Sequence, residues 1–265
     1  MIMANLYGQI YEKGSCGLEN INKLEMSIIY PDGKSDQGER DVISEHELTV
    51  TVNEITLYRI ICIKDHLKEL VTGRLFTDRL IEDRDDISRL FFCRYEKEVS
   101  VFLKKDISPE DTIGPDLTCC SGNRVYVAAK KPGLKKLIPC ELKKEWVFEL
   151  VKEFGKGTRL HELTSAVHIC ILAREGKKLF VSEDIGRHNA VDKAVGYALL
   201  NGIPLSECML FTSGRVPVDM VEKVIAAGIP VLVSKSVPTQ ESVLLSHEFG
   251  LTLICRAWPD RFELY

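Results

Sequence analysis

The sequence predicts an α/β protein in which a regular second half follows a smaller, mainly β first half. Three observations lead to this fold class. Strand-like and helix-like runs alternate three times in the second half, a pattern typical of a mainly parallel sheet covered by helices on both faces. The first half consists of short β-rich runs and one run with helical spacing. A long segment without periodicity lies between them, and such segments in compact proteins are typically functional or mobile.

These changes of pattern divide the chain into four parts. A chain of 265 residues is long enough to bury a substantial core in two modest domains. We expect an N-terminal tail over residues 1–25, a mainly antiparallel β domain with one helix over 26–105, a mobile loop over 106–139, and an α/β domain that binds a cofactor over 140–265.

The β-rich runs of the first half predict two strand pairs. "ELTVTVNEITLYRIICI" contains two runs around Asn53 and Glu54, which favours a hairpin. "KDHLKELVTGRLFTDRL" has apolar residues at helical spacing from Leu67 to Leu75, with Asp65 as the predicted N-cap. "ISRLFFCRYEKEVSVFLKK" predicts the second pair.

The second half predicts a hairpin, three strand-to-helix units and a closing strand pair. "AVHICILA" and "KLFVSEDI" form the hairpin, and "LTLICRA" with "RFELY" form the closing pair. The three units are "FVSEDIGRHNAVDKAVGYALLNG", "CMLFTSGRVPVDMVEKVIAAG" and "IPVLVSKSVPTQESVLLSHEFG". Gly202, Gly228 and Gly250 stand where glycines end helices.

Composition excludes two classes of partner. A formal net charge of -4 gives no general attraction to nucleic acid, so any anion site must be local. No apolar stretch approaches the roughly 18 residues that a membrane-spanning helix needs. The polar N-terminal run "MIMANLYGQIYEKGSCG" lacks the apolar core of a signal peptide, so we expect a cytoplasmic protein without membrane contacts.

Seven of the nine cysteines fall into two groups, and Cys16 and Cys140 belong to neither. Cys62, Cys93, Cys170, Cys208 and Cys255 lie in apolar, strand-like runs, which predicts buried thiols. The adjacent cysteines of "GPDLTCCSGNR" do not lie in an apolar run. They could be a redox pair, half of a metal site, or a reactive sulfur carrier that needs room to move.

The chemistry of adjacent thiols favours the carrier. A structural zinc site needs four ligands, usually in two spaced pairs, and no second pair is present. The deaminase zinc signature is also missing, because the Pro-Cys of "IPCELK" has no second cysteine, so we expect no metal ligands. A disulfide between adjacent residues is strained. A persulfide carrier needs an exposed thiolate on a long loop, and the segment around Cys119 and Cys120 meets that need.

Polar turns follow the predicted strands of the three units. In an α/β sheet, ligands bind beyond the carboxyl ends of the strands, where helix N-termini offer free amides to anions. Arg187 and Arg215 each follow a glycine in such a turn and can bind phosphate with two hydrogen bonds. Asn189, Ser213 and Thr239 could instead be simple helix caps. The candidate binding residues at these turns are Arg187, His188, Asn189, Ser213, Gly214 and Arg215, and His168, in the first strand of the predicted hairpin, is a further candidate.

Two long motifs carry a family resemblance. "EDIGRHNAVDKAVG" and "TSGRVPVDMVEKVIAAGIPVLVSKSVPT" resemble the formate dehydrogenase accessory sulfurtransferase family. The resemblance extends more loosely through "LTSAVHICIL" and "EHELTVTVNEITLYRIICIKDHLKELVTGRLFTD", and leaves the first twenty-five residues uncovered.

The resemblance implies a function and its partners. Members take persulfide sulfur from a cysteine desulfurase and deliver it to the molybdenum of the bis(molybdopterin guanine dinucleotide) cofactor, their cargo, for formate dehydrogenase. It also implies a cytidine deaminase-like, three-layer α/β domain and a homodimer. The C-terminal segment matches a cofactor-contacting part of the family through Ile254, Cys255, Arg256, Ala257, Trp258, Pro259 and Arg261.

The sequence departs from the family at the carrier motif. Relatives commonly have Cys-x-x-Cys where this chain has "TCCSGN". We prefer Cys120 as the carrier, with Cys119 second, because the small residues Ser121 and Gly122 follow Cys120 directly. The departure leaves open an alternative in which the protein is a chaperone that binds the cofactor without transferring sulfur. "ICIK" and "TDRLIED" also depart from the usual Thr-Pro and Glu-Gly of relatives.

Overall fold

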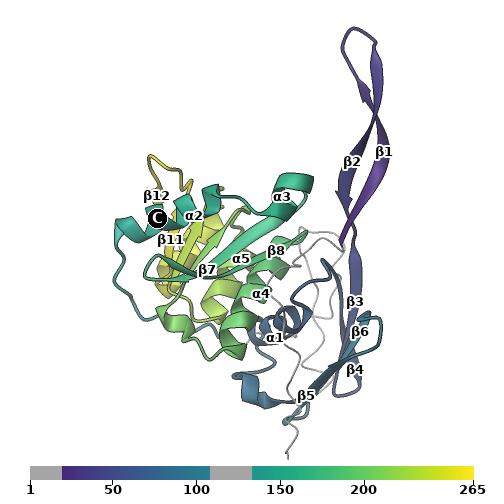
Figure 1. The fold of residues 1–265 in the computed structure, drawn as a ribbon. Coiled ribbons are helices and arrows are strands. Elements are labelled where there is room, and N and C mark those ends of the chain that lie inside the picture. The colour runs from purple at the N-terminus through teal and green to yellow at the C-terminus, as the bar shows by residue number, and fades with distance from the viewer. Residues whose placement is uncertain (1–19, 108–132) are drawn as a thin grey trace, which may run out of the picture.

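A computed structural model describes residues 20–107 and 133–265 of the protein. It is a mixed α/β structure with three sheets (Figure 1). In the described ranges, no helix is both long and apolar enough to cross a bilayer. The elements are β1 (Ile21–Ile29), β2 (Ser35–Ile43), β3 (His46–Val52), β4 (Ile55–Cys62), α1 (Leu67–Thr77), β5 (Ile87–Phe92), β6 (Glu98–Leu103), α2 (Lys144–Gly155), α3 (Arg159–Thr164), β7 (His168–Arg174), β8 (Lys177–Asp184), α4 (Arg187–Leu200), β9 (Met209–Thr212), α5 (Val218–Ala226), β10 (Val231–Ser234), α6 (Gln240–Phe249), β11 (Thr252–Cys255) and β12 (Glu263–Leu264), with short 3-10 helices at Arg84–Asp86 and Leu205–Glu207.

The largest sheet has six strands in the order β12-β11-β10-β9-β7-β8. The predicted hairpin, three strand-to-helix units and closing strand pair are all present. The expectation of a mainly parallel sheet is wrong, because only β9–β10 and β10–β11 pair in parallel. The tight turn at Glu175 and Gly176, both at positive φ, returns β8 along the outer side of β7. Strand β9 therefore pairs with β7, antiparallel, rather than with β8.

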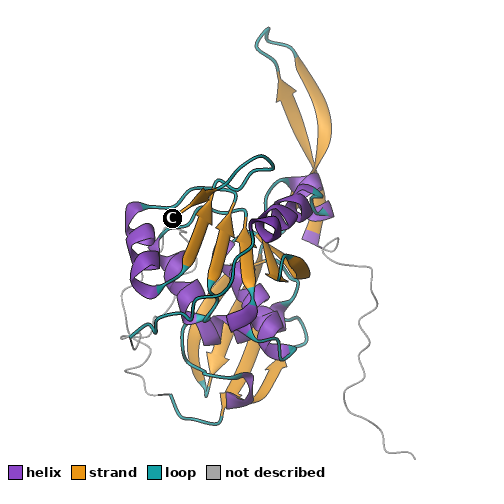
Figure 2. Ribbon diagram, turned by 90° about the vertical axis from the view of Figure 1, so that its left-hand side faces the viewer, coloured by secondary structure: helices purple, strands orange, loops and turns teal. Residues whose placement is uncertain are grey.

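Helices cover both faces of this sheet (Figure 2). Alternate side chains of each strand point to opposite faces. On one face, Cys170, Leu172 and Leu210 pack against α4 and α5 in one hydrophobic cluster. On the other face, Ile171 and Phe211 pack against α2 in a second cluster. The second half is thus a three-layer α/β/α arrangement.

The glycines predicted to end helices do so. Gly202, Gly228 and Gly250 have φ of 64°, 74° and 74°, directly after or at the ends of α4, α5 and α6. A residue with a Cβ is strained in this left-handed region, whereas glycine is not.

The first half forms a four-stranded sheet in the order β4-β3-β6-β5. The hairpin at Asn53 and Glu54 and the pair β5–β6 are confirmed. The helix is also confirmed, but Asp65 is not its cap: His66 holds the N-cap position in a left-handed conformation without a side-chain cap. Leu70 and Leu75 of α1 pack on the sheet in a separate core cluster.

Helix α1 joins the two halves by packing closely on α4. A Cβ added to Gly73 would overlap the carbonyl oxygen of Asp192, and one added to Gly196 would overlap that of Glu69. The two helices therefore cross with their backbones in contact. A buried ionic cluster lies beside this crossing: Asp192 accepts from Lys223 at 2.6 Å and from Thr77 at 2.8 Å.

Strands β1 and β2 form a two-stranded hairpin that projects from the rest of the molecule (Figures 1 and 2). Strand β1 begins at Ile21, so the tail boundary expected at residue 25 falls within a strand. The base of the hairpin is anchored by Ile21 and Ile43, which pack on a small cluster that contains Ile63, Leu160 and Val167.

The thiols of the described residues follow the predicted burial with one exception. Cys62, Cys170, Cys208 and Cys255 are buried, as expected. Burial raises the pKa of Cys62 to about 12 and that of Cys208 to about 11. The expectation for Cys93 is wrong: β5 ends at Phe92, so Cys93 falls in the following turn and is exposed.

Candidate functional site

One edge of the six-stranded sheet gathers the predicted binding residues. Strands β8 to β11 all run toward this edge, and β7 starts there. His168 is opposite Asp184 in the sheet register, and Thr212 is opposite Ser234. The turns after β8, β9, β10 and β11 therefore lie side by side, as expected for the ligand-binding edge of an α/β sheet.

Asp184 organises the turn after β8. This carboxylate is fully buried and accepts hydrogen bonds from the amide of Gly186 at 3.0 Å and the side chain of Asn189 at 2.9 Å. It also accepts from the amide of Ile63 at 3.1 Å, while Asn189 donates to the carbonyl of Ile61 at 2.8 Å. Asn189 is therefore no simple helix cap. It fixes the start of α4 against "ICIK", the segment where this chain departs from the family.

A buried lysine completes the environment of Asp184. The ammonium of Lys193 lies 2.8 Å from the Asp184 carboxylate and donates to the carbonyl of Glu183 at 2.9 Å. Both charged side chains are 0% exposed. Because the pair is neutral overall, it holds the turn without adding net charge to the site.

His168, Arg187, Ser213 and Gly214 come together beside this turn. The Nδ1 atom of His168 lies 3.4 Å from the Ser213 hydroxyl, which also accepts from the amide of Ile169 at 3.0 Å. A Cβ on Gly214 would lie 3.2 Å from the Arg187 Cβ and 3.5 Å from His168 Nδ1. Glycine therefore allows the two turns to approach each other. Burial lowers the pKa of His168, and the positive charge of Arg187 lowers it further.

His188 pairs with an acid from the next unit. Its Nε2 atom lies 3.1 Å from the carboxylate of Asp219 in α5. Burial lowers the pKa of His188 despite the hydrogen bond to Asp219, which opposes that shift. Burial alone would raise the pKa of Asp219, but the bond to His188 keeps it below its ordinary value. The pair links the start of α4, after β8, to the start of α5, after β9.

Two further basic side chains stand at the edge. Arg215 is exposed, directly after the turn that contains Gly214. Lys235 follows β10, and its ammonium lies 5.1 Å from the ring centroid of Phe154 and 5.4 Å from that of Trp258. Aromatic faces attract a cation at such distances, so they orient the Lys235 ammonium at this edge.

The C-terminal segment divides into buried and exposed residues. Arg256, Trp258, Pro259 and Arg261 are exposed, so they can meet a ligand. The side chains of Ile254, Cys255 and Ala257 are at most 2% exposed and belong to the core, so only their backbone groups could reach one.

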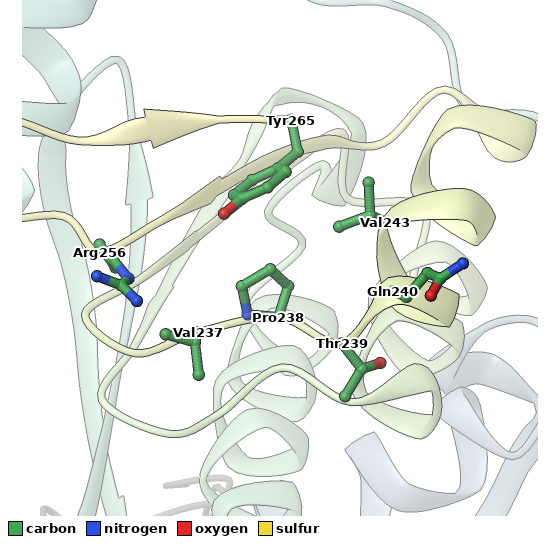
Figure 3. A pocket seen from close by; sticks show the side chains of 7 residues that line it. All are labelled: Val237, Pro238, Thr239, Gln240, Val243, Arg256 and Tyr265. Carbon is green, nitrogen blue, oxygen red and sulfur yellow. The ribbon is translucent and has the colours of Figure 1, made fainter.

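A pocket of about 290 Å³ opens beside Arg256 (Figure 3). Its walls come from the start of α6 and from the C-terminus. Thr239 is the cap of α6, as the simpler interpretation of that residue predicts, since it accepts from the Ser242 amide at 3.3 Å. The lining residues are Val237, Pro238, Thr239, Gln240, Val243, Arg256 and Tyr265.

The predicted carriers Cys119 and Cys120 lie outside the described residues.

Sequence reasoning missed two residues of this site. Asp219 and Lys193 were not predicted as partners of His188 and Asp184. The signal for Lys193 was the unusual density of charge in "EDIGRHNAVDK", more than a turn and a helix start require for folding, whereas Asp219 lies outside that motif. Within the described ranges, no three His, Cys, Asp or Glu side chains form a group able to hold a metal ion.

Comparison with known proteins gives consistent matches. A model of the FdhD/NarQ family matches residues 43–265. The chain is 28% identical to "Sulfur carrier protein FdhD" of Bacillus subtilis over 89% of this chain and 92% of the relative. It is 29% identical to the protein of that name from Bacillus pumilus, over 93% and 96%. A crystal structure described as a formate dehydrogenase accessory protein, from Desulfotalea psychrophila, has a TM-score of 0.75 at 24% identity, over 92% of this chain and 96% of that chain, and therefore shares the fold.

Proposed function

Since the chain belongs to the FdhD/NarQ family, we propose that it is a sulfurtransferase that loads persulfide sulfur from a cysteine desulfurase and delivers it to the molybdenum of a bis(molybdopterin guanine dinucleotide) cofactor. Its relatives carry the name sulfur carrier protein, which supports a role in sulfur transfer. Formate dehydrogenase is the proposed client, and the α/β domain is proposed to be cytidine deaminase-like.

The loading step requires one nucleophilic thiolate. Cys120, with Cys119 as the second candidate, would attack the outer sulfur of the desulfurase persulfide. A new sulfur–sulfur bond forms at the carrier, and the old bond breaks with its electron pair on the desulfurase cysteine. That cysteine then takes up a proton, so the exchange needs no external oxidant or reductant.

The cationic edge of the sheet is the observation that supports a nucleotide-bearing cargo. His168, Arg187, Arg215 and Lys235 all stand at this edge, in turns that follow or precede neighbouring strands. Guanine nucleotide ends carry phosphates, and guanidinium groups bind phosphates with paired, charge-assisted hydrogen bonds. Arg187, Arg215 and Lys235 gather positive charge at one edge of a chain whose net charge is -4, which suits an anion.

Sulfur loading is tested by intact mass. The protein is incubated with a cysteine desulfurase and cysteine, and we expect a single adduct of about 32 Da that reduction removes. Cys120→Ala should lose the adduct if Cys120 is the carrier, and Cys119→Ala should lose it if Cys119 is. If neither variant nor the wild type is ever loaded, the chaperone that binds cofactor without transferring sulfur becomes the better assignment.

Cys93 provides the matched control. Its thiol is exposed. Desolvation, the largest single contribution, raises the pKa of Cys93, but the backbone amides of Glu98, Tyr95 and Lys97 together lower it below the ordinary value. Cys93 should therefore react readily with alkylating agents, faster than the buried Cys170, whose pKa is raised by burial. Cys93→Ser should remove that background labelling and leave persulfide loading intact. Loss of the adduct in Cys93→Ser would contradict the assignment to Cys119 or Cys120.

A further inference from the structure

Ser213 and His168 form a hydrogen-bonded pair at the sheet edge. The Ser213 hydroxyl oxygen accepts from the amide of Ile169 at 3.0 Å, and the Ser213 amide donates to the carbonyl of Ile169, also at 3.0 Å. These two bonds hold the hydroxyl oxygen 3.4 Å from Nδ1 of His168. A serine oxygen can accept two hydrogen bonds and donate one. Because Ile169 takes one accepting position, the other position and the hydroxyl hydrogen are available to His168 and to a ligand.

The charge on His168 decides in which direction its bond to Ser213 runs. In a neutral imidazole with its hydrogen on Nε2, Nδ1 accepts, so the Ser213 hydroxyl donates to it. In the imidazolium form, Nδ1 carries a hydrogen and donates to the Ser213 oxygen. The hydroxyl hydrogen is then released and can be donated to an anion at the edge. One proton added to His168 thus converts Ser213 into a donor for a ligand.

The charges that face His168 are mostly positive. Burial lowers the pKa of His168 from its ordinary value, and the Arg187 guanidinium at the start of α4 lowers it further. His188 of α4 and Arg215 after β9 act in the same direction. The carboxylate of Asp184, opposite His168 in β8, opposes them. Since the lowered pKa lies below 7, His168 is neutral at pH 7 in the free protein.

A phosphate bound at this edge reverses that balance. The Arg187 side chain and the His168 ring lie beside the same point, because a Cβ on Gly214 would be 3.3 Å from Cδ of Arg187 and 3.5 Å from Nδ1 of His168. A phosphate held by the guanidinium therefore brings its negative charge to the imidazole. An opposite charge within about 4–6 Å favours the charged form of a titratable group.

We propose that His168 and Ser213 act together as a proton-coupled ligand for a phosphate group, in which phosphate binding draws one proton from solvent onto Nδ1 of His168 and the Ser213 hydroxyl then donates to the phosphate. The inference rests on the proposed role of this edge in binding the phosphates of a guanine nucleotide. It adds that binding strengthens as pH falls. By linkage, affinity rises between the higher pKa of His168 in the complex and its pKa in the free protein, which lies below the ordinary value of about 6.5.

Proton uptake during GDP binding tests this coupling. GDP is titrated into the protein at pH 7.5 by calorimetry, in buffers of different ionisation enthalpy, and the dependence of the heat on the buffer gives the number of protons taken up. The terminal phosphate of GDP has a pKa of about 6, so it is already ionised at this pH. We expect the wild type to take up a measurable fraction of one proton, and its affinity for GDP to rise about threefold from pH 8 to pH 7.

Three variants separate the parts of the pair. His168→Gln keeps an oxygen that can accept from Ser213 but cannot take up a proton, so the proton uptake and the threefold change should disappear. Ser213→Ala should keep the proton uptake and raise the dissociation constant about two- to tenfold, through loss of one hydrogen bond. His247→Gln is the matched control, because His247 is exposed and lies near the end of α6, away from the edge where that helix begins.

Each outcome decides the inference. Uptake in the wild type and in His247→Gln, but not in His168→Gln, supports it. No uptake in the wild type, or equal uptake in His168→Gln, overturns it. In the wild type, the NMR signal of the His168 Cε1 hydrogen must also move toward the imidazolium position when GDP is added at pH 7. Absence of any GDP binding overturns the inference too, whereas sulfur transfer is tested separately by persulfide loading.

Discussion

The ammonium of Lys193 lies 2.8 Å from the carboxylate of Asp184, and neither side chain has any exposed surface. The pair connects the middle of α4 to the end of β8. Because Asp184 also accepts hydrogen bonds from Gly186, Asn189 and Ile63, the ion pair fixes the turn that leads into Arg187 and His188, both of which are buried. The position of the candidate site thus depends on the fully buried charge of Lys193.

Removing the ammonium should therefore be costly. Lys193→Met leaves the Asp184 carboxylate buried without its cation, and we expect the free energy of unfolding to fall by about 3–5 kcal/mol. Urea denaturation followed by circular dichroism measures the change. The double variant Asp184→Asn, Lys193→Met removes both charges and should recover part of the loss. A decrease below about 1 kcal/mol in the single variant would show that Asp184 does not rely on Lys193.

The crossing of α1 and α4 predicts a second effect on stability. Gly73→Ala places a methyl group where the Asp192 carbonyl lies, so the helices must separate. We expect a loss of about 1–3 kcal/mol in the free energy of unfolding. Gly155→Ala is the control, since its Cβ would meet nothing within 4 Å and alanine favours the helix. Equal effects of the two substitutions would be inconsistent with the close crossing.

His188 should make stability depend on pH. Its pKa in the folded protein is below the ordinary value of 6.5, chiefly because of burial. Below that ordinary value the unfolded chain binds more protons than the folded one, so His188 reduces stability as pH falls and this penalty disappears at higher pH. The stability of the wild type relative to His188→Asn should therefore decrease from pH 7.5 to 5.5. Urea titrations at several pH values measure it, and parallel curves would contradict the pKa shift.

Arg215 should contribute to binding of the guanine nucleotide ends. Losing its paired hydrogen bonds to phosphate should cost roughly 1.5–3 kcal/mol, about ten- to a hundredfold in affinity. Calorimetric titration of GDP into Arg215→Ala measures this. Arg94→Ala, an exposed arginine in the β5–β6 turn, is the matched control and should bind as the wild type does. Wild-type affinity in Arg215→Ala would remove Arg215 from the site.

The C-terminal arginines need their own measurement. Arg256 and Arg261 are exposed, so the double variant Arg256→Ala, Arg261→Ala should fold normally. We expect weaker GDP binding while persulfide loading stays intact, because loading involves the cysteines alone. Unchanged GDP binding would confine the nucleotide site to the turns after β8, β9 and β10.

Local sequence pattern determined much of the architecture. The strand-to-helix units, the hairpin at Asn53 and the helix-ending Gly202, Gly228 and Gly250 follow from periodicity and backbone preference, which act over a few residues. The same local reasoning brought Arg187 and Arg215 to one edge, because parallel strands followed by helices must present their turns together. It also assigned Cys93 to a strand, wrongly, because strand ends are poorly marked in sequence.

Tertiary structure alone decided what each of these residues contacts. No pattern in the chain pairs His188 with Asp219, seats Lys193 on Asp184, inserts β7 between β8 and β9, or brings Gly73 against the backbone of α4. Apart from the pair of Lys193 and Asp184, which lie in consecutive elements, these relationships join residues far apart in the chain, and they exist only once the sheet order and the helix crossing are set. Periodicity tells which face of an element is apolar, but the packing of whole elements selects the partner that covers it.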